Sequence, residues 1–221
     1  MIPRELLATA QIPDGPEMRL YRRGEDHMIL LERDELMSTR MSGSEEALAT
    51  LTAARLEARA GQRWLIGGYG MGFTLRAALA ALPADASVTV AELVPEILDW
   101  ARGPMAALTA DCLEDPRTHL HIGDVADPIA AGGWDAILLD VDNGPDALVR
   151  AKNQWLYEPA GLAVARAALK PGGVLAIWSA APDSRFSKTL LEAGFRVEEQ
   201  EVRARSNGKG PRHFIWFASL R

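Results

Sequence analysis

RWLIGGYGMGFTLR, at residues 63–76, is the stretch of sequence that decides the fold. Its first part is a short apolar strand, its middle is a glycine-rich turn, and its end starts a helix that continues to Leu82. Glycine permits a sharp turn and a close approach of the backbone to a ligand. The unpaired amides at the start of the following helix suit an anionic or hydroxyl-rich ligand. The stretch therefore predicts a ligand-binding loop, the alternative being a tight strand-to-helix turn that binds nothing.

The spacing of the glycines indicates the class of ligand. In a dinucleotide-binding fingerprint the third glycine follows the second by three residues, whereas here Phe73 occupies that position. No Gly-Lys-Ser/Thr follows the turn, which disfavours a phosphate-binding P-loop. We therefore expect an adenosyl-type cofactor rather than NAD. The residues of the turn that are predicted to bind it are Gly68, Tyr69, Gly70, Met71 and Gly72.

Length, charge and cysteine content bound the class of protein. The 221 residues suit one compact α/β domain with a small appendage, and an apolar content of 48% is enough for a core. A net charge of −6 argues against nucleic acid as a partner. Cys112 is the single cysteine, so we expect neither a disulfide framework nor a metal site. The chain has no signal-peptide features and no run that would span a membrane, so we expect a cytoplasmic protein without a membrane partner.

Before the glycine turn, the pattern predicts a small amino-terminal unit. A short helix is expected at residues 3–10, and a β-meander of short strands follows it. The strands of the meander are expected at residues 18–21, 28–31 and 36–39. An amphipathic helix is then expected over residues 45–59. The meander is too short to be stable alone, so we divide the chain into residues 1–60, which lean on the rest, and residues 61–221.

From residue 61 onward, strands and helices alternate, which is typical of a parallel sheet covered on both faces. After the strand that starts the glycine stretch, strands are expected at residues 87–91, 119–122, 134–139, 174–178, 195–202 and 213–218. The last two flank a turn. The pattern predicts an α/β protein with a Rossmann-like methyltransferase fold: a seven-stranded, mostly parallel sheet with a terminal antiparallel hairpin, plus the short amino-terminal meander.

Polar residues at the ends of the second and third strands complete the predicted cofactor site, because ligands of open parallel sheets bind beyond the carboxyl ends of the strands. Glu92 is suited to accept hydrogen bonds from both ribose hydroxyls; the alternative is a charge that stabilises the start of the next helix. Asp124 is suited to accept from an adenine amino group, with Gly123 giving the backbone room; the alternative is a helix cap or an Asx turn. Leu93 and Val125, which follow these residues, are also predicted to bind the cofactor.

Two aspartates that follow the fourth strand are predicted to be catalytic. Asp140 and Asp142 are expected to lie over the reactive end of the cofactor, so Asp140 also counts as a cofactor-binding residue. Two neighbouring carboxylates favour a cationic or amine acceptor, and each raises the pKa of the other, as a general base requires. The alternative is that both residues cap the loop. A basic loop at residues 203–213 is interpreted either as a contact for an acidic part of the acceptor or as a solvated turn.

In their order and spacing, these motifs resemble the spermidine synthase family (polyamine aminopropyltransferases), a branch of the class I S-adenosylmethionine-dependent methyltransferase superfamily. The motifs that carry the resemblance are the glycine turn with Thr74-Leu75-Arg76, Glu92 before Pro95, Gly123-Asp124, the strand that ends in Asp140, Leu31-Glu32-Arg33-Asp34-Glu35 and Leu169-Lys170-Pro171-Gly172-Gly173. The resemblance implies that Glu92 binds ribose, that Asp124 binds adenine and that Asp140 deprotonates an amine nucleophile. It also implies a homodimer.

The chain departs from the family pattern on the side of the diamine and of the aminopropyl group. Met71 stands where family members place an aspartate that contacts the aminopropyl amine. Asn143 stands where the second aspartate of the family's diamine-holding loop belongs, and residues 36–44 replace a tyrosine-containing segment. The sequence therefore supports binding of an adenosyl cofactor more strongly than synthesis of spermidine.

These observations lead to one expected function and two alternatives. We expect a transferase that binds S-adenosylmethionine and transfers its methyl group to a small-molecule acceptor, with Asp140 removing the acceptor's proton. The first alternative is transfer of an aminopropyl group from decarboxylated S-adenosylmethionine to a diamine or similar amine. The second is a nucleotide-binding protein without catalytic activity.

Overall fold

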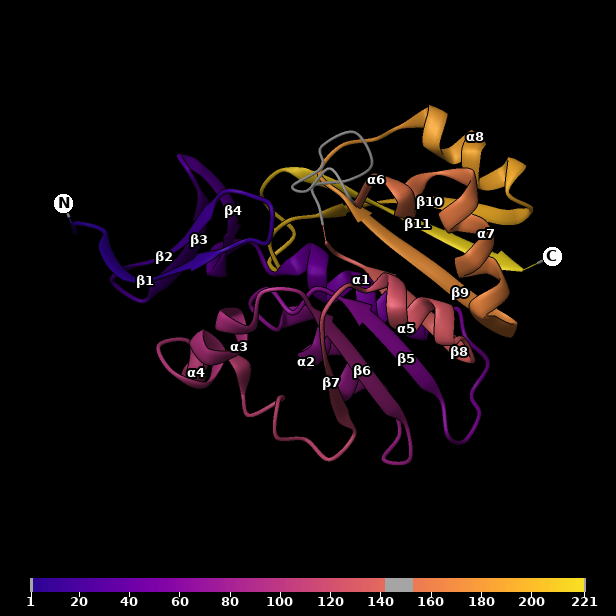
Figure 1. The fold of residues 1–221 in the computed structure, drawn as a ribbon, viewed down its shortest axis with the longest axis horizontal. Helices are drawn as coiled ribbons and strands as arrows, with labels where there is room; N and C mark the ends of the chain where they lie inside the picture. Colours follow the sequence, from indigo (N-terminus) through magenta and orange to yellow (C-terminus); the bar gives the residue numbers. More distant parts are fainter. Residues whose placement is uncertain (1, 142–152, 221) are drawn as a thin grey trace.

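Two β-sheets form the framework of the chain, which the computed structural model describes over residues 2–141 and 153–220 (Figure 1). The smaller sheet is an antiparallel meander of β1 (Glu5–Gln11), β2 (Glu17–Arg23), β3 (Asp26–Leu31) and β4 (Asp34–Ser38). The larger sheet contains β5 (Arg63–Gly67), β6 (Ser87–Glu92), β7 (Thr118–Ile122), β8 (Trp134–Leu139), β9 (Leu169–Ser179), β10 (Phe195–Arg203) and β11 (Arg212–Leu220). Its strand order is β10-β11-β9-β8-β5-β6-β7; β5 to β9 are parallel, and β10 and β11 form the antiparallel hairpin. The predicted fold class is confirmed.

Helices cover both faces of the larger sheet, since alternate residues of a strand point to opposite faces. Trp64 and Ile66 of β5 are buried in a core that they share with α1 (Gly43–Ala53), α2 (Phe73–Ala81) and α3 (Pro95–Arg102). Leu65 between them is buried in a second core with α5 (Ala126–Ala131), α7 (Pro159–Ala168) and α8 (Ser184–Glu192). The shorter helices are η1 (Thr39–Met41), α4 (Ala106–Thr109) and α6 (Gln154–Tyr157). No helix in residues 2–141 and 153–220 has the length and apolar run that crossing a membrane requires.

The meander packs its apolar side chains on the rest of the chain. Leu20 and Ile29 are fully buried and belong to the same core as Ile97 of α3, and β1 contacts α3. Figure 1 shows the small sheet beside the larger one, at the side of the molecule that carries the amino terminus. The division of the chain at residue 60 stays a prediction.

The short helix expected at residues 3–10 is wrong, because Glu5–Gln11 form strand β1. A helix of this length has little stability of its own, whereas the ladder from Glu5↔Arg22 to Gln11↔Glu17 pairs the backbone groups with β2. The helix expected over residues 45–59 is also shorter than predicted, since α1 ends at Ala53. Beyond it, Arg55 forms an ion pair with Glu198 of β10.

Asp135 ties together the amino-terminal ends of three strands. Its side chain is 0% exposed, and its Oδ2 accepts hydrogen bonds from the backbone N–H of Arg63 and from Nζ of Lys170, both at 2.7 Å. Arg59 forms a second ion pair with the same carboxylate. A buried carboxylate is tolerated when it is paired in this way. These contacts hold β5, β8 and β9 together at the edge opposite to the carboxyl ends.

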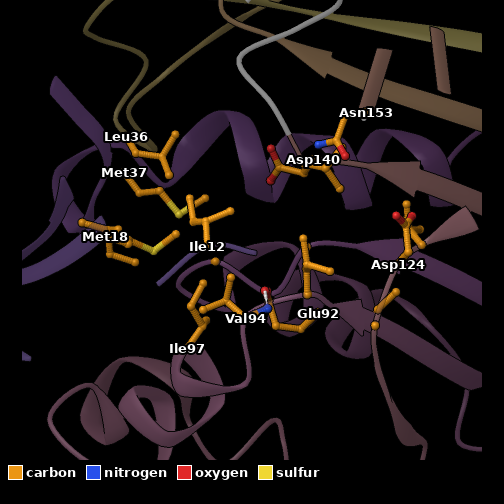
Figure 2. Close-up of a pocket in the computed structure, with 18 residues that line it drawn as sticks. Ile12, Met18, Leu36, Met37, Glu92, Val94, Ile97, Asp124, Asp140 and Asn153 are labelled. Atoms are coloured by element: carbon orange, nitrogen blue, oxygen red, sulfur yellow. Dashed lines mark hydrogen bonds between the residues drawn. The ribbon is translucent and has the colours of Figure 1, made fainter. Parts of the chain in front are cut away.

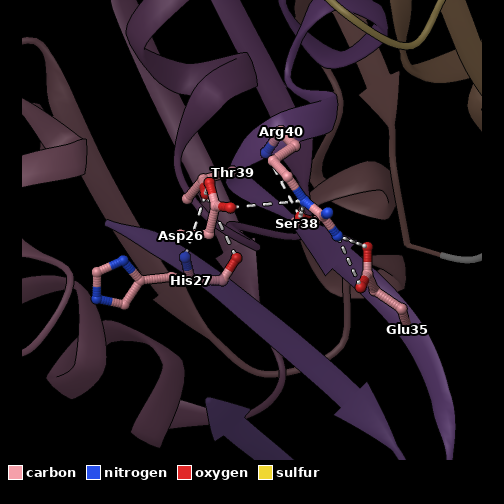
Figure 3. Close-up of polar contacts among 6 residues, drawn as sticks. All are labelled: Asp26, His27, Glu35, Ser38, Thr39 and Arg40. Carbon is pink, nitrogen blue, oxygen red and sulfur yellow. Dashed lines mark hydrogen bonds and ion pairs between the residues drawn. The ribbon is translucent and has the colours of Figure 1, made fainter. Parts of the chain in front are cut away.

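A polar corner joins the meander to the start of α1 (Figure 3). Thr39 Oγ1 accepts a hydrogen bond from the backbone N–H of His27 at 3.1 Å. The Arg40 guanidinium forms ion pairs with Glu35 at 3.4 Å and with Asp26 at 3.8 Å. Because these residues come from β3, β4 and η1, their contacts hold η1, which leads into α1, against the meander.

Candidate functional site

The glycine turn joins β5 to α2 next to β8, where the strand order of the larger sheet reverses. Gly68, Gly70 and Gly72 have φ values of 85°, 56° and 76°, a region in which other residues are strained. A Cβ on Gly68 would lie 2.7 Å from the carbonyl oxygen of Asp140, and one on Gly70 would lie 2.6 Å from Cε of Met37. The turn therefore requires glycine both for its conformation and for the close approach of β8 and the meander.

A cavity, which we call the first cavity, lies beyond the carboxyl ends of β5, β6, β7 and β8 (Figure 2). Figure 2 shows Glu92 and Asp140 on opposite sides of it, with Asp124 towards one end and Met18 towards the other. The predicted site residues that line it are Gly68, Gly70, Glu92, Leu93, Gly123, Asp124, Val125 and Asp140. The meander contributes an apolar wall made of Ile12, Met18, Ile29, Leu36 and Met37. The sheet thus supplies the polar part of the cavity and the meander the apolar part.

Glu92 is held at the end of β6 by two backbone amides. Its side chain is 5% exposed; Oε2 accepts from the N–H of Tyr69 at 2.9 Å and Oε1 from the N–H of Val94 at 2.8 Å. Burial raises the pKa of Glu92, while these backbone hydrogen bonds oppose the rise. The backbone N–H groups of Leu93 and Gly70 also lower this pKa, and the carboxylate lines the first cavity as an acceptor. This geometry suits a pair of ribose hydroxyls.

Gly123 and Asp124 follow β7 at the far end of the first cavity. Gly123 donates its N–H to the carbonyl oxygen of Glu92 at 2.9 Å, which fixes the two strand ends relative to each other. Asp124 Oδ1 accepts the N–H of Ala126 at 3.0 Å at the start of α5. Asp124 therefore forms an Asx turn just before α5 and lines the cavity at the same time, so the local role and a contact with a ligand are compatible. Val125 is buried beside it.

Three predicted residues of the glycine turn do not line the first cavity. The side chain of Tyr69 is 3% exposed, and its hydroxyl lies 3.6 Å from Sγ of Cys112. Met71 is 1% exposed and packs in the core, and Gly72 precedes α2 as its N-cap. The turn therefore lines the cavity at Gly68 and Gly70, while the buried side chains of Tyr69 and Met71 anchor it in the core.

A second cavity adjoins the first. The two linings share Leu36, Met37, Asp140 and Val141. The remaining residues of the second cavity are Ser38, Met41, Ser44, Glu45, Trp178 and His213. Asp140 is thus the ionisable side chain that lines both cavities, so its carboxylate can contact a molecule in either one.

The environment of Asp140 gives it the properties of a base. Burial raises the pKa of Asp140 to about 6, while Thr74 Oγ1, which donates to Oδ2 at 3.3 Å, opposes the rise. Burial, and then the negative charges of Asp140 and Glu46, raise the pKa of Glu45 well above its ordinary range. A carboxylate with a pKa near 6 accepts protons efficiently near neutral pH. The site can therefore remove a proton from a molecule in the second cavity.

Several residues of the second cavity could not be identified as site residues from the sequence. Glu45 reads as part of a helix start, and nothing in the pattern connects it with Asp140, which is far away in the chain. Of the basic residues in the loop at 203–213, His213 is the one among the described residues that line these two cavities. Asp142 lies outside the described residues. Within residues 2–141 and 153–220, no group of three or more His, Cys, Asp or Glu side chains is placed to hold a metal ion.

Comparison with known proteins shows what this chain resembles. No protein-family model matches the chain. Polyamine aminopropyltransferases of Mycobacterium tuberculosis (strains CDC 1551 / Oshkosh and H37Rv) and of Mycobacterium bovis are 29% identical over 149 residues. The spermidine synthase of Thermotoga maritima matches the fold with a TM-score of 0.75 at 16% identity, and a spermidine synthase in complex with the transition state analogue AdoDATO matches with 0.76. The chain is similar in fold to spermidine synthases and, over part of its length, similar in sequence to polyamine aminopropyltransferases.

The matches cover different shares of this chain and of the relatives. The sequence match covers 62% of this chain but only 28% of the length of the mycobacterial relatives. The structural matches cover 98% of this chain and 72% of the spermidine synthases, and at 16% identity they bear on the fold. The expectation of methyl transfer is nevertheless wrong on this comparison, because the relatives are aminopropyltransferases by name. The similarity favours aminopropyl transfer, which the sequence left as an alternative.

Proposed function

We propose that this chain transfers the aminopropyl group of decarboxylated S-adenosylmethionine to the nitrogen of a small-molecule amine. The observation that carries the proposal is the position of Asp140, which lines both cavities where they adjoin. A donor in the first cavity and an amine in the second meet at this carboxylate. Holding two reactants in contact in this way is a large part of the catalysis of a two-substrate displacement.

The first cavity fits the nucleoside part of the donor. Glu92 and Asp124 line it with carboxylate oxygens, which can accept from the ribose hydroxyls and from the adenine amino group respectively. The apolar wall of the meander suits the methylene groups of an aminopropyl chain. These residues support an adenosyl donor with an aliphatic tail.

The charges of the first cavity support the decarboxylated donor. Among its described lining residues, the ionisable side chains are three carboxylates, Glu92, Asp124 and Asp140, and none is Lys or Arg. The tail carboxylate of intact S-adenosylmethionine would meet these negative charges without a cationic partner. The decarboxylated form carries a sulfonium and an ammonium, both positive, which the carboxylates attract.

The proposed reaction is a single displacement. The acceptor nitrogen attacks the propyl carbon that is bound to sulfur; the C–N bond forms as the C–S bond breaks, and the electron pair of the C–S bond goes to sulfur. 5′-Methylthioadenosine leaves, and the nitrogen gives up one proton. Asp140 accepts this proton, as its pKa of about 6 allows near neutral pH.

A direct test combines binding and turnover on the purified chain. Calorimetric titration is expected to give tighter binding of decarboxylated than of intact S-adenosylmethionine. Mass spectrometry is expected to find 5′-methylthioadenosine and an aminopropylated product only when an amine, such as a diamine, is added. Equal affinity for the intact form would contradict the proposed donor, and donor binding without turnover of any amine would favour a nucleotide-binding protein. A homodimer is a further expectation, which ultracentrifugation of the same sample would test.

Thr74→Val is expected to move the acid limb of the pH–activity profile to higher pH. The Thr74 hydroxyl stabilises the charged form of Asp140 and so lowers its pKa. Without the hydroxyl the pKa rises further above 6, so a higher pH is needed to keep the base deprotonated; a hydrogen bond of ~1 kcal/mol corresponds to about 0.7 pH units. The measurement is kcat from pH 5 to 9, with Thr74→Ser as the matched control that keeps the hydroxyl. An unmoved or lowered inflection in the valine variant would contradict the assigned role of Asp140.

A further inference from the structure

Tyr69 of the glycine turn contacts Glu92 through its backbone and the core through its side chain. Its N–H donates to Glu92 Oε2 at 2.9 Å, so the position of this amide decides where that carboxylate oxygen lies. The residues on either side of it are Gly68 and Gly70, and glycine has more backbone freedom than any other residue. A turn of this composition needs an anchor outside its own backbone to hold the amide in place.

The side chain of Tyr69 has the contacts of such an anchor. It is 3% exposed, and its hydroxyl lies 3.6 Å from Sγ of Cys112. A Cβ on Gly72 would lie 2.6 Å from the same hydroxyl oxygen, so a side chain at residue 72 would displace it. Burial raises the pKa of Tyr69, which keeps the hydroxyl protonated and able to donate.

Cys112, at the other end of this contact, is fixed by its own backbone. Its N–H donates to the carbonyl oxygen of Thr109 at 3.0 Å, and its carbonyl oxygen accepts from Thr118 Oγ1 at 2.8 Å. Thr118 is the first residue of β7, and β6, which ends in Glu92, lies between β5 and β7 in the sheet. The Tyr69 side chain therefore ties the turn that follows β5 to the segment that precedes β7.

We propose that Tyr69 is a positioning residue of the nucleoside site: its side chain, held against Cys112, fixes the amide that orients Glu92 towards the ribose. The inference rests on the nucleoside part of the proposed function, because Glu92 is the group that it orients. Tyr69 is not among the described residues that line the first cavity, so it acts through Glu92. Without the hydroxyl the turn is free to shift, and the ribose hydroxyls lose a correctly placed acceptor.

The test measures the affinity for 5′-methylthioadenosine in a double-mutant cycle. Tyr69→Phe is expected to weaken binding about 3- to 10-fold, the effect of one lost hydrogen bond. Cys112→Ala is expected to weaken it by a similar factor, and Cys112→Ser to recover part of the affinity. The double variant of Tyr69→Phe and Cys112→Ala is expected to bind no more weakly than either single one, because both changes remove the same contact.

Tyr157→Phe supplies the matched control. It also removes the hydroxyl of a buried tyrosine, but Tyr157 belongs to the second core and is not among the described residues that line either cavity. Its affinity for 5′-methylthioadenosine is expected to stay within about twofold of the wild type.

Two further readouts separate a positioning role from a merely structural one. Tyr69→Phe is expected to discriminate less than the wild type between 5′-methylthioadenosine and its 2′-deoxy form, since the misplaced group is the ribose acceptor. The N–H of Tyr69 also lowers the pKa of Glu92. Its displacement raises that pKa, so the loss of nucleoside affinity on acidification is expected to begin at a higher pH in the variant.

The outcomes distinguish this inference from the proposed function. Equal affinity, ribose discrimination and pH profile in the wild type and in folded Tyr69→Phe would overturn the role of Tyr69 and keep the function. Additive losses in the double variant would contradict the anchor on Cys112. A wild type that does not bind 5′-methylthioadenosine would overturn the proposed function and this inference with it. Thermal unfolding shows that each variant is folded.

Discussion

Asp140→Asn is expected to lower kcat about 10³-fold, within the range found for removal of a general base. Asparagine keeps the shape of the side chain and can still accept the hydrogen bond from Thr74, but it cannot take up a proton. Affinity for 5′-methylthioadenosine is expected to change little, since Glu92 and Asp124 are untouched. The measurement is single-turnover aminopropyl transfer beside calorimetric binding. Asp99→Asn, an exposed change on α3, serves as the control.

The same variant is expected to be more stable than the wild type at pH 8. The pKa of Asp140 is raised in the folded chain from 3.8 to about 6. A raised pKa means that the stability contribution is complete below pH 4 and is lost as the pH rises through about 6. At pH 8 the wild type has lost up to about 3 kcal/mol in this way, since one pKa unit is worth ~1.4 kcal/mol, whereas asparagine has lost none.

Urea unfolding at pH 5 and at pH 8 tests this sign. The gain in the free energy of unfolding from Asp140→Asn is expected to be larger at pH 8 than at pH 5. A gain that does not depend on pH would contradict the raised pKa. A variant that retains more than a tenth of wild-type kcat would contradict the assignment of Asp140 as the base.

Glu92→Gln is expected to weaken binding of the nucleoside about 10²- to 10³-fold. Both oxygens of Glu92 accept backbone N–H groups while they line the first cavity. Glutamine replaces one oxygen with an NH₂ group, which places two donors face to face and removes the charge. Hydrogen bonds to charged groups are worth roughly 1.5–3 kcal/mol each, and two of them to ribose account for the expected loss.

Calorimetry with 5′-methylthioadenosine measures the loss of nucleoside affinity, and its 2′-deoxy form shows whether the loss arises at the ribose hydroxyls. The wild type is expected to bind the 2′-deoxy compound more weakly, whereas Glu92→Gln is expected to discriminate less between the two. Glu96→Gln, four residues further on in α3 and outside the cavity lining, is the matched control. If folded Glu92→Gln binds 5′-methylthioadenosine within threefold of the wild type, Glu92 is not the ribose ligand.

The sequence predicts the larger sheet and the polar half of the site because both follow from local pattern. Glu92 and Asp140 each stand directly at the end of an apolar strand, and parallel strands bring their carboxyl ends to one edge. The glycine turn was predictable for the same reason, but the direction of its side chains was not. Met71 points into the core. This direction depends on the packing of α2 and cannot be predicted from the spacing of the glycines.

The second cavity could not be predicted, because it is assembled from distant segments. Glu45 starts a helix, Trp178 ends a strand and His213 begins the last strand, so each has an ordinary local role. Only the packing of α1 against the sheet brings them to Asp140. Strand β1 was missed for a related reason: a short segment takes its conformation from the strand it pairs with, here β2.

Strand β8 has an aspartate near each end, and the two would respond in opposite ways to artificial selection. Asp135 is buried among cations, whereas Asp140 has no ion pair within the described residues. A variant library screened only for heat tolerance or folded yield would reject uncharged replacements of Asp135 and enrich those of Asp140. The same library screened for turnover would discard the second group. Directed evolution of this chain for robustness alone would therefore erase its chemistry at Asp140 while keeping its fold at Asp135.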